Sequence, residues 1–178
     1  MTDRSRRLYL DGDRVDVVHR DATPHLVADV GIARAVVVAL AAAGAPKPAS
    51  VTVVLTDDVE LADLNRAHMG VDGPTDVLSF PMLPPGAFRS SHRRPPGGAQ
   101  PRGSRIHIGD IAISVERAQE QAEKGRGGQT GDVRWSPADE LRLLVTHGTL
   151  HLCGWDHAQR EEEAAMRAVE RRLLGVDR

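Results

Sequence analysis

Residues 147–157 read HGTLHLCGWDH, and the histidines in this stretch are four and then six residues apart. Side chains four apart on a helix lie on one face, so His147 and His151 present their rings to the same point. Gly154 ends such a helix, and the turn after it brings in His157. Three imidazoles are a common zinc ligand set and leave a fourth tetrahedral position open. The stretch predicts a catalytic site for one zinc ion per chain, with His147, His151 and His157 as ligands.

A zinc ion that only organises the fold is the alternative interpretation of these ligands. Structural zinc sites mostly use four protein ligands, often cysteines. The single cysteine, Cys153, is two residues after His151 and points off the ligand face, so we expect it to be a small buried residue. Zinc proteases with this spacing carry a glutamate directly after the first histidine. This chain has Gly148 there, which disfavours peptide hydrolysis.

Three blocks of the sequence together resemble one known family. HGTLHLCGWDH is similar to the HGxLHLxGYDH signature of the YbeY endoribonucleases, bacterial metal-dependent factors that mature ribosomal RNA. Residues 64–81, LNRAHMGVDGPTDVLSFP, resemble the N-R-x-x-R-x-x-D-x-P-T-D-V-L-S-F-P stretch of that family, and residues 109–111 match its G-D-I. The blocks occur in the family's order, and the resemblance covers about residues 50 to 175.

The resemblance carries expectations about fold and function. The order of elements suggests an α+β domain, and the family's fold implies a four-stranded mixed sheet covered by about five helices, with the metal site on the C-terminal histidine helix and the turn after it. The implied function is that of a zinc-dependent, single-strand-specific endoribonuclease in ribosomal RNA maturation and ribosome quality control. The implied partners are single-stranded or ribosomal RNA and ribosomal small-subunit proteins. Two alternatives remain: an assembly or RNA-binding factor with a structural zinc, and a metallohydrolase of another substrate.

Two positions depart from the family pattern. Many members have an arginine where this chain has Met69, and that arginine is thought to lie near the metal and to handle substrate. Arg66 matches the family's other arginine, and we expect it to take over that role. Ser79, in the second block, is the other candidate substrate-binding residue. Trp155 replaces the usual tyrosine, which keeps an aromatic ring but loses a phenolic hydrogen bond. No side chain stands out as a general base, so catalytic residues stay unassigned.

Composition is that of a single globular domain over residues 1–178. A formal charge of −2 argues neither for nor against RNA, because one basic stripe is enough to bind it. One cysteine excludes a disulfide within the chain and suits the reducing cytoplasm. The N-terminus has no apolar stretch of a signal peptide, and the apolar run 33–45 is too short to span a bilayer. We therefore expect a cytoplasmic protein with no membrane segment.

Residues 83–105 differ from the rest of the chain. They are rich in proline, glycine and arginine and contain no acidic residue. Such segments bury too little apolar surface to offset the entropy of ordering them. We expect a flexible insertion, which is either a solvated variable loop or a cationic arm that grips RNA phosphates.

Periodicity and capping signals predict the remaining elements. The expected strands are residues 15–18, 51–55, 75–80 and 106–114, and the last is expected to have a bulge or close backbone approach at Gly109. The expected helices are residues 26–43, 57 or 58 to 68, the histidine helix capped by Ser136, and 161–174, where the last serves packing. Leu144 is expected on the same helical face as His147 and His151. Four other histidines lie outside any ligand spacing and are interpreted as surface or packing residues: His19, His25, His68 and His92.

Overall fold

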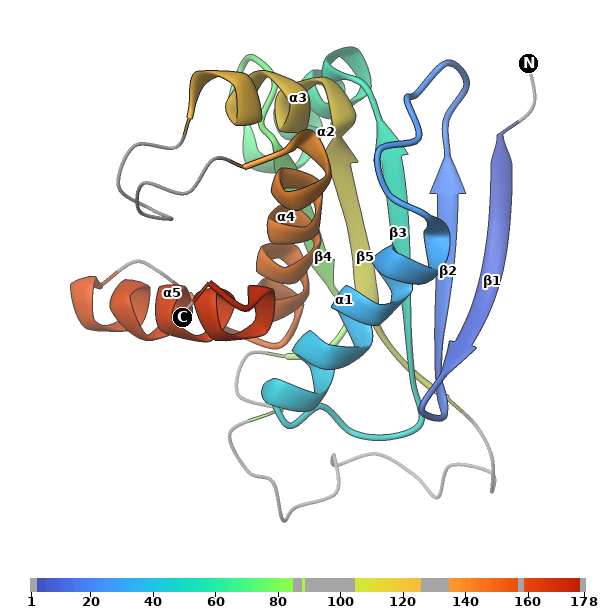
Figure 1. Cartoon of the computed structure of the whole chain (residues 1–178), viewed down its shortest axis with the longest axis vertical. Helices are drawn as coiled ribbons and strands as arrows, with labels where there is room; N and C mark the ends of the chain where they lie inside the picture. Colours follow the sequence, from blue (N-terminus) through green and yellow to red (C-terminus); the bar gives the residue numbers. More distant parts are fainter. Residues whose placement is uncertain (1–2, 85–87, 89–104, 126–134, 157–158, 177–178) are drawn as a thin grey trace.

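The computed structural model describes residues 3–84, 88, 105–125, 135–156 and 159–176. Within these ranges the chain forms five strands and five helices (Figure 1). The elements, in chain order, are β1 (Arg4–Leu10), β2 (Asp13–His19), α1 (Asp29–Ala42), β3 (Ala49–Thr56), α2 (Asp58–Met69), β4 (Val77–Pro81), β5 (Ile106–Ser114), α3 (Val115–Lys124), α4 (Pro137–Leu152) and α5 (Arg160–Leu174). The α+β class and the five helices are as expected.

The sheet has five strands, one more than expected, in the order β1-β2-β3-β5-β4. Its inner strands β2, β3 and β5 run parallel, and the edge strands β1 and β4 pair antiparallel to their neighbours. The additional strand is β1, whose many arginines hide the apolar alternation of a half-buried strand. Asp11 and Gly12 form the turn that joins it to β2, with φ of 50° and 87°. An Asp-Gly pair with two positive φ values is typical of tight hairpins.

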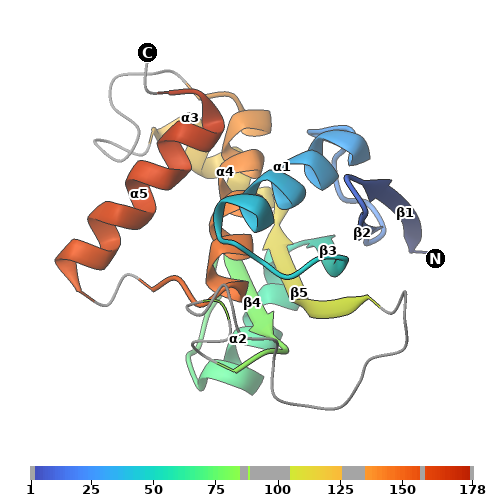
Figure 2. The ribbon, with the colours of Figure 1, turned by 90° about the horizontal axis from the view of Figure 1, so that it is seen from below.

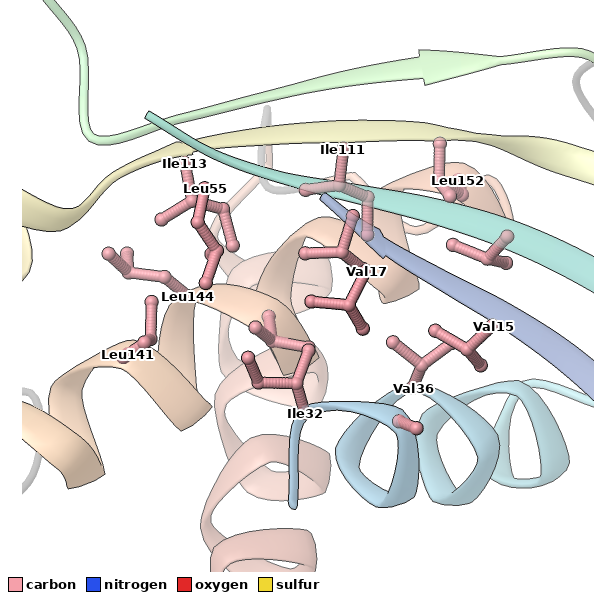
Figure 3. Packing of buried hydrophobic residues seen from close by; sticks show 14 of the residues in the cluster. Val15, Val17, Ile32, Val36, Leu55, Ile111, Ile113, Leu141, Leu144 and Leu152 are labelled. Carbon is pink, nitrogen blue, oxygen red and sulfur yellow. The ribbon is translucent and has the colours of Figure 1, made fainter. Parts of the chain in front are cut away.

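The main core lies between one face of the sheet and the helices α1 and α4. Figure 2 shows these two helices on that face and α2 beneath the other, beside β4. Strand residues such as Val17 and Ile111 pack there against Ile32 of α1 and Leu141 of α4 (Figure 3). A smaller cluster, centred on Leu61, joins α2 to the opposite face. None of the described helices is long and apolar enough to cross a membrane.

The bulge expected at Gly109 is present in β5. The register between β3 and β5 shifts after Ser50, so that one additional residue is accommodated on β5. Gly109 has a φ of 154°, and a Cβ built on it would lie 2.4 Å from the Phe80 carbonyl oxygen. Only glycine therefore permits β4 to approach β5 so closely at this point.

Most helix boundaries follow the local signals. Asp57 caps α2 by accepting from the Glu60 N–H, and Gly70 ends that helix in the left-handed conformation. Helix α1 begins at Asp29, three residues later than position 26. Helix α3 is not among the elements expected from the sequence; Ser114 caps it by accepting from the Arg117 N–H at 3.1 Å. Most of the expected insertion, residues 85–87 and 89–104, lies outside the described residues, so its flexibility stays a prediction.

Candidate metal centre

Helix α4 carries the two histidines that the described residues bring together. The helix starts in a capping box, in which Ser136 and Asp139 each accept from the other's backbone N–H, with Pro137 in its first turn. His147 and His151 follow on one face, and their Nε2 atoms lie 3.0 Å apart. The third expected ligand, His157, lies outside the described residues.

The separation of the two imidazoles fits a metal ion. Two nitrogens that bind one tetrahedral zinc at 2.0–2.1 Å are about 3.3 Å apart. The Nε2 atoms of His147 and His151 need to move apart by only a few tenths of an ångström to reach that distance. Both nitrogens belong to the donor type that zinc prefers, so this donor pair fits half of a tetrahedral site.

Glu170 holds the first of these imidazoles from behind. This residue of α5 is nearly buried, and its Oε1 lies 2.7 Å from His147 Nδ1. A carboxylate can only accept here, so Nδ1 carries the proton and Nε2 keeps its lone pair for a metal. Sequence reasoning treated α5 as packing and missed this residue. The available signal was its spacing, because Glu170 is one turn after Met166 on the buried face.

A cavity of about 520 Å³ opens beside the two histidines, between the end of α4 and strand β4. Ser79 and Pro81 line it from the strand, and Ser79 Oγ donates to the Gly148 carbonyl at 3.0 Å. A Cβ on Gly148 would meet Ile111 Cγ2 at 2.8 Å, so the glycine lets α4 lie close to the sheet. Leu144 was expected on this side but is buried in the main core.

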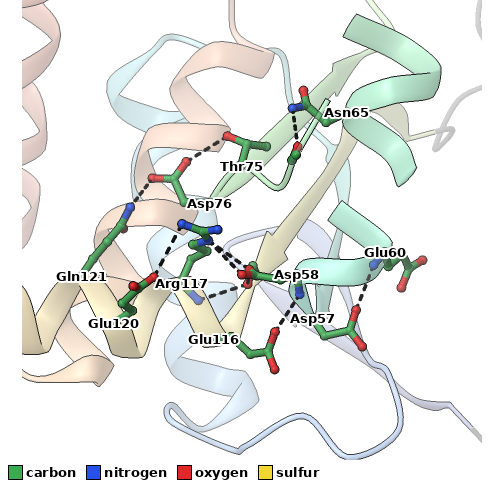
Figure 4. Close-up of polar contacts among 12 residues, drawn as sticks. Asp57, Asp58, Glu60, Asn65, Thr75, Asp76, Glu116, Arg117, Glu120 and Gln121 are labelled. Atoms are coloured by element: carbon green, nitrogen blue, oxygen red, sulfur yellow. Dashed lines mark hydrogen bonds and ion pairs between the residues drawn. The ribbon is translucent and has the colours of Figure 1, made fainter. Parts of the chain in front are cut away.

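The loop before β4 contributes an acidic wall to the cavity. Thr75 and Asp76 both line it, and neither was singled out from the sequence although both lie in the second block. Asp76 accepts from Gln121 Nε2 of α3 at 3.0 Å (Figure 4). It also accepts from the Val77 N–H at 2.9 Å. Helix α3 thus fixes the loop at the start of β4. Asp156 and Trp155 line the cavity from the turn after α4.

A family model for the endoribonuclease YbeY matches residues 25–176, which include both histidines of α4 and strand β4 of the cavity wall. The chain belongs to the YbeY endoribonuclease family. Proteins named Endoribonuclease YbeY from Salinispora tropica and from Symbiobacterium thermophilum are each 41% identical to it. The first match covers 74% of this chain and 76% of the relative, and the second covers 76% of each.

The fold of this YbeY family member is similar to that of a solved structure. The solution structure of TM1509 from Thermotoga maritima superposes with a TM-score of 0.52 and covers 92% of this chain and 89% of that one. Sequence identity between the two is 20%, so this likeness bears on the fold alone.

Met69 stands where many YbeY members have an arginine, and Arg66 lies one helical turn before it. Met69 lines the cavity and is 53% exposed. The Arg66 guanidinium is held outside, 3.1 Å from Asp72 and 3.4 Å from Asp63, and it is not among the residues that line the cavity. The role of Arg66 in substrate binding therefore stays a prediction.

Cys153, His68 and His107 are not among the residues that line this cavity. Cys153 is buried, as expected, and burial raises the pKa of its thiol to about 12, which keeps it neutral. His68 packs edge-on against Phe80, and His107 lies 3.0 Å from Asp110. His92 lies outside the described residues.

His19 is buried and His25 is exposed, as expected of packing and surface residues, but together with Asp29 they form a donor group that the sequence spacing did not indicate. Their ring nitrogens and a carboxylate oxygen of Asp29 all lie within 4.8 Å of one another, and this donor set is one that can hold a metal ion. The sequence spacing concealed the group, because a loop between β2 and α1 brings the three residues together.

Proposed function

We propose that this YbeY family member is a zinc-dependent endoribonuclease that cuts single-stranded RNA, and that it acts in ribosomal RNA maturation and ribosome quality control in the cytoplasm. The observation that carries the proposal is the 3.0 Å approach of two imidazole nitrogens on the wall of a cavity large enough for a nucleotide. Zinc is preferred because the donors are imidazoles.

The proposed metal ligands are His147, His151 and His157. Glu170 orients the first imidazole through its 2.7 Å contact, and the turn after Gly154 carries the third. When bound, zinc supplies positive charge at the scissile phosphate and makes a nearby water or ribose hydroxyl more nucleophilic. The chain's own residues then have to bind the strand and place one phosphate beside these histidines.

The cavity lining supports a single strand as substrate. Trp155 and Phe88 both line it, and an aromatic ring can stack on a base only where that base is unpaired. Ser79 Oγ already donates to Gly148, so its free lone pair can accept from a ribose hydroxyl. We propose that Ser79 and Arg66 contact the substrate, with Arg66 exchanging Asp72 for a phosphate.

The test combines metal content with cleavage. Untagged protein is compared with His151→Ala, with chelator-treated protein and with treated protein given zinc, on labelled single-stranded RNA and on the matching duplex. We expect the untagged protein to hold about one zinc ion at this centre and to cleave the single strand but not the duplex. His151→Ala and the chelator-treated protein should not cleave, and zinc should restore cleavage to the chelator-treated protein. Bound zinc with intact RNA in every arm contradicts the proposal and favours an RNA-binding or ribosome assembly factor with a structural zinc.

A second arm tests the ribosomal role. Cells that lack the protein are expected to accumulate ribosomal RNA precursors, and the wild-type gene should restore processing where the His151→Ala gene does not. Binding of small-subunit ribosomal proteins is measured with the same two proteins. Normal precursor levels in the deleted strain count against a role in maturation, while activity on the isolated RNA would still define the enzyme.

A further inference from the structure

His19, His25 and Asp29 meet at the end of the sheet where β2 stops and α1 starts. His19 is the last residue of β2, His25 lies in the loop, and Asp29 is the first residue of α1. The loop folds back so that α1 begins beside β2 (Figure 1). No residue of this group lines the cavity beside α4, so the group is separate from the candidate metal centre.

Two of the three side chains are buried with atoms that lack a hydrogen bond. His19 is 3% exposed and Asp29 is 4% exposed. They contact each other through His19 Nε2 and Asp29 Oδ1 at 2.8 Å. The other nitrogen of His19, Nδ1, and the other oxygen of Asp29, Oδ2, are buried without a hydrogen-bond partner among the described residues. Leaving such atoms unpaired in the interior is unfavourable, because each has lost its hydrogen bonds to water.

The nearest cations do not satisfy the buried carboxylate. Arg4 and Arg6 of β1 place guanidinium nitrogens 3.6 and 3.7 Å from Asp29 Oδ2, beyond hydrogen-bond distance. Both arginine side chains are 59% exposed, so they are free to turn toward solvent. A cation that enters between the histidines and Asp29 would satisfy the carboxylate more directly.

His25 supplies the third donor from the solvent side. Its ring centroid lies 4.2 Å from that of His19, and the residue itself is exposed. The donor atoms around a tetrahedral zinc ion are about 3.3 Å apart. The donor atoms of His19, His25 and Asp29 lie within 4.8 Å of one another. His19 Nε2 and Asp29 Oδ1 have to separate by a few tenths of an ångström from their distance of 2.8 Å. His25 is an exposed side chain on a loop, so it can move toward them without disturbing the core.

We propose that His19, His25 and Asp29 form a second metal site, which binds a divalent transition-metal ion of zinc's class. Two imidazoles and one carboxylate are a donor set of zinc enzymes and leave one position for water. At this place the ion joins the end of β2 to the start of α1, and through Arg4 and Arg6 it neighbours the edge strand β1. Its expected effect is to stabilise the N-terminal part of the sheet.

The test is a count of bound zinc in untagged full-length variants, loaded with zinc after chelator treatment and then freed of excess metal. The wild type is expected to hold about two ions per chain, and His25→Ala and the double variant His147→Ala/His151→Ala about one each. Combining all three substitutions should leave none. His25 is exposed, so its removal should leave the fold intact, and circular dichroism checks this. His68→Ala, which removes another exposed histidine, is the matched control and should behave as wild type.

A second readout reports the site independently of the α4 histidines. In the double variant His147→Ala/His151→Ala, added zinc is expected to raise the Tm, and the further change His25→Ala should abolish that rise. One zinc per chain in the wild type, with none in the double variant, overturns the second site and leaves the proposed function standing. Two ions that persist in His25→Ala overturn it as well. If the double variant His147→Ala/His151→Ala loses one zinc ion and RNA cleavage, that result bears only on the proposed enzyme.

Discussion

Glu170 is the residue through which α5 takes part in the candidate metal centre. Its carboxylate lies 2.7 Å from His147 Nδ1, on the side of the ring away from the cavity. A histidine that is held in this way presents its other nitrogen in one orientation and with higher basicity. We therefore expect the contact between α4 and α5 to affect metal affinity as well.

We expect Glu170→Gln to weaken zinc binding by about 10–100-fold, because a neutral amide neither orients nor polarises the imidazole as a carboxylate does. Competition against a chelating dye measures the dissociation constant directly. Glu163→Gln is the control, since Glu163 lies on the same helix but pairs with Arg167. Equal zinc affinity in Glu170→Gln and wild type would show that the contact only packs the two helices.

Met69 and Arg66 lie one helical turn apart at the end of α2. Met69 faces the cavity, whereas Arg66 is held by two carboxylates outside it. Met69→Arg is expected to strengthen single-stranded RNA binding by about tenfold, the value of one charge-assisted hydrogen bond to a phosphate. Arg66→Ala is expected to reduce RNA cleavage, and Val59→Ala, a change at an exposed residue of the same helix, serves as the control. If Arg66→Ala cleaves RNA at the wild-type rate, Arg66 takes no part in substrate binding.

At the scale of elements, the close approach of β4 to β5 depends on one glycine. A side chain at residue 109 would meet the Phe80 carbonyl at 2.4 Å and Leu152 at 2.8 Å. Gly109→Ala is therefore expected to lower the free energy of unfolding by about 2–4 kcal/mol, from backbone strain and overpacking together. Urea denaturation measures it. Gly175→Ala also has a positive φ but open space around it, so it should cost only about 1 kcal/mol. Equal losses in the two variants would contradict the argument from close approach.

Helix α2 is attached to the end of β2 by an ion pair. Arg20 Nε and Nη2 donate to the Glu60 carboxylate at 2.8–3.2 Å, and these hydrogen bonds hold the pKa of Glu60 below its usual value despite partial burial. A lowered pKa adds stability above the unfolded value of about 4.3, and that stability is lost as the pH falls through the folded value.

Glu60→Gln should therefore lose less stability than wild type when the pH falls from about 5 to about 3. Thermal unfolding across that pH range measures the difference in stability loss between the two proteins. The effect of Glu60→Gln on this loss should vanish when it is made in the Arg20→Gln background, where the partner of Glu60 is absent. Glu123→Gln, on the exposed surface of α3, is the control. Parallel pH profiles for wild type and Glu60→Gln would mean that the ion pair adds nothing to folding.

At the scale of the whole molecule, the basic segment 83–105 can contribute to RNA affinity through its positive charge. The segment contains five arginines, at positions 89, 93, 94, 102 and 105, and no acidic residue. If the segment grips RNA, its deletion should make the dependence of log affinity on log salt shallower by about 0.7 for each phosphate that these arginines neutralise. The same slope in the deleted and full-length chains would favour a solvated loop. Binding is measured with single-stranded RNA at several salt concentrations.

What could be predicted from the sequence differs between elements for physical reasons. Helix α4 has a cap, a proline in its first turn and a glycine after its end, and each is a local signal that packing did not override. Strand β1 was missed because it is an edge strand with mostly exposed side chains, although Asp11 and Gly12 marked its hairpin. Helix α3 buries only Val115 and Ala118, so its apolar face was too narrow to recognise.

The candidate site was predictable where ligands are close in sequence. His147 and His151 share one helix, so spacing alone placed them together. Glu170, Asp76 and the group around His19 depend on contacts between separate elements, which spacing cannot reveal. The position of Arg66 was likewise decided by Asp72, a partner in the loop after α2.

The two edges of the sheet have a consequence for how the protein behaves at high concentration. An unpaired edge strand is a template on which a second copy can add its own strand. Strand β1 carries exposed Arg4, Arg6 and Arg7, and β4 ends in Pro81, which has no N–H to donate. Like charges and a missing donor both oppose strand addition. We therefore expect that crowding alone does not drive these molecules to polymerise edge to edge.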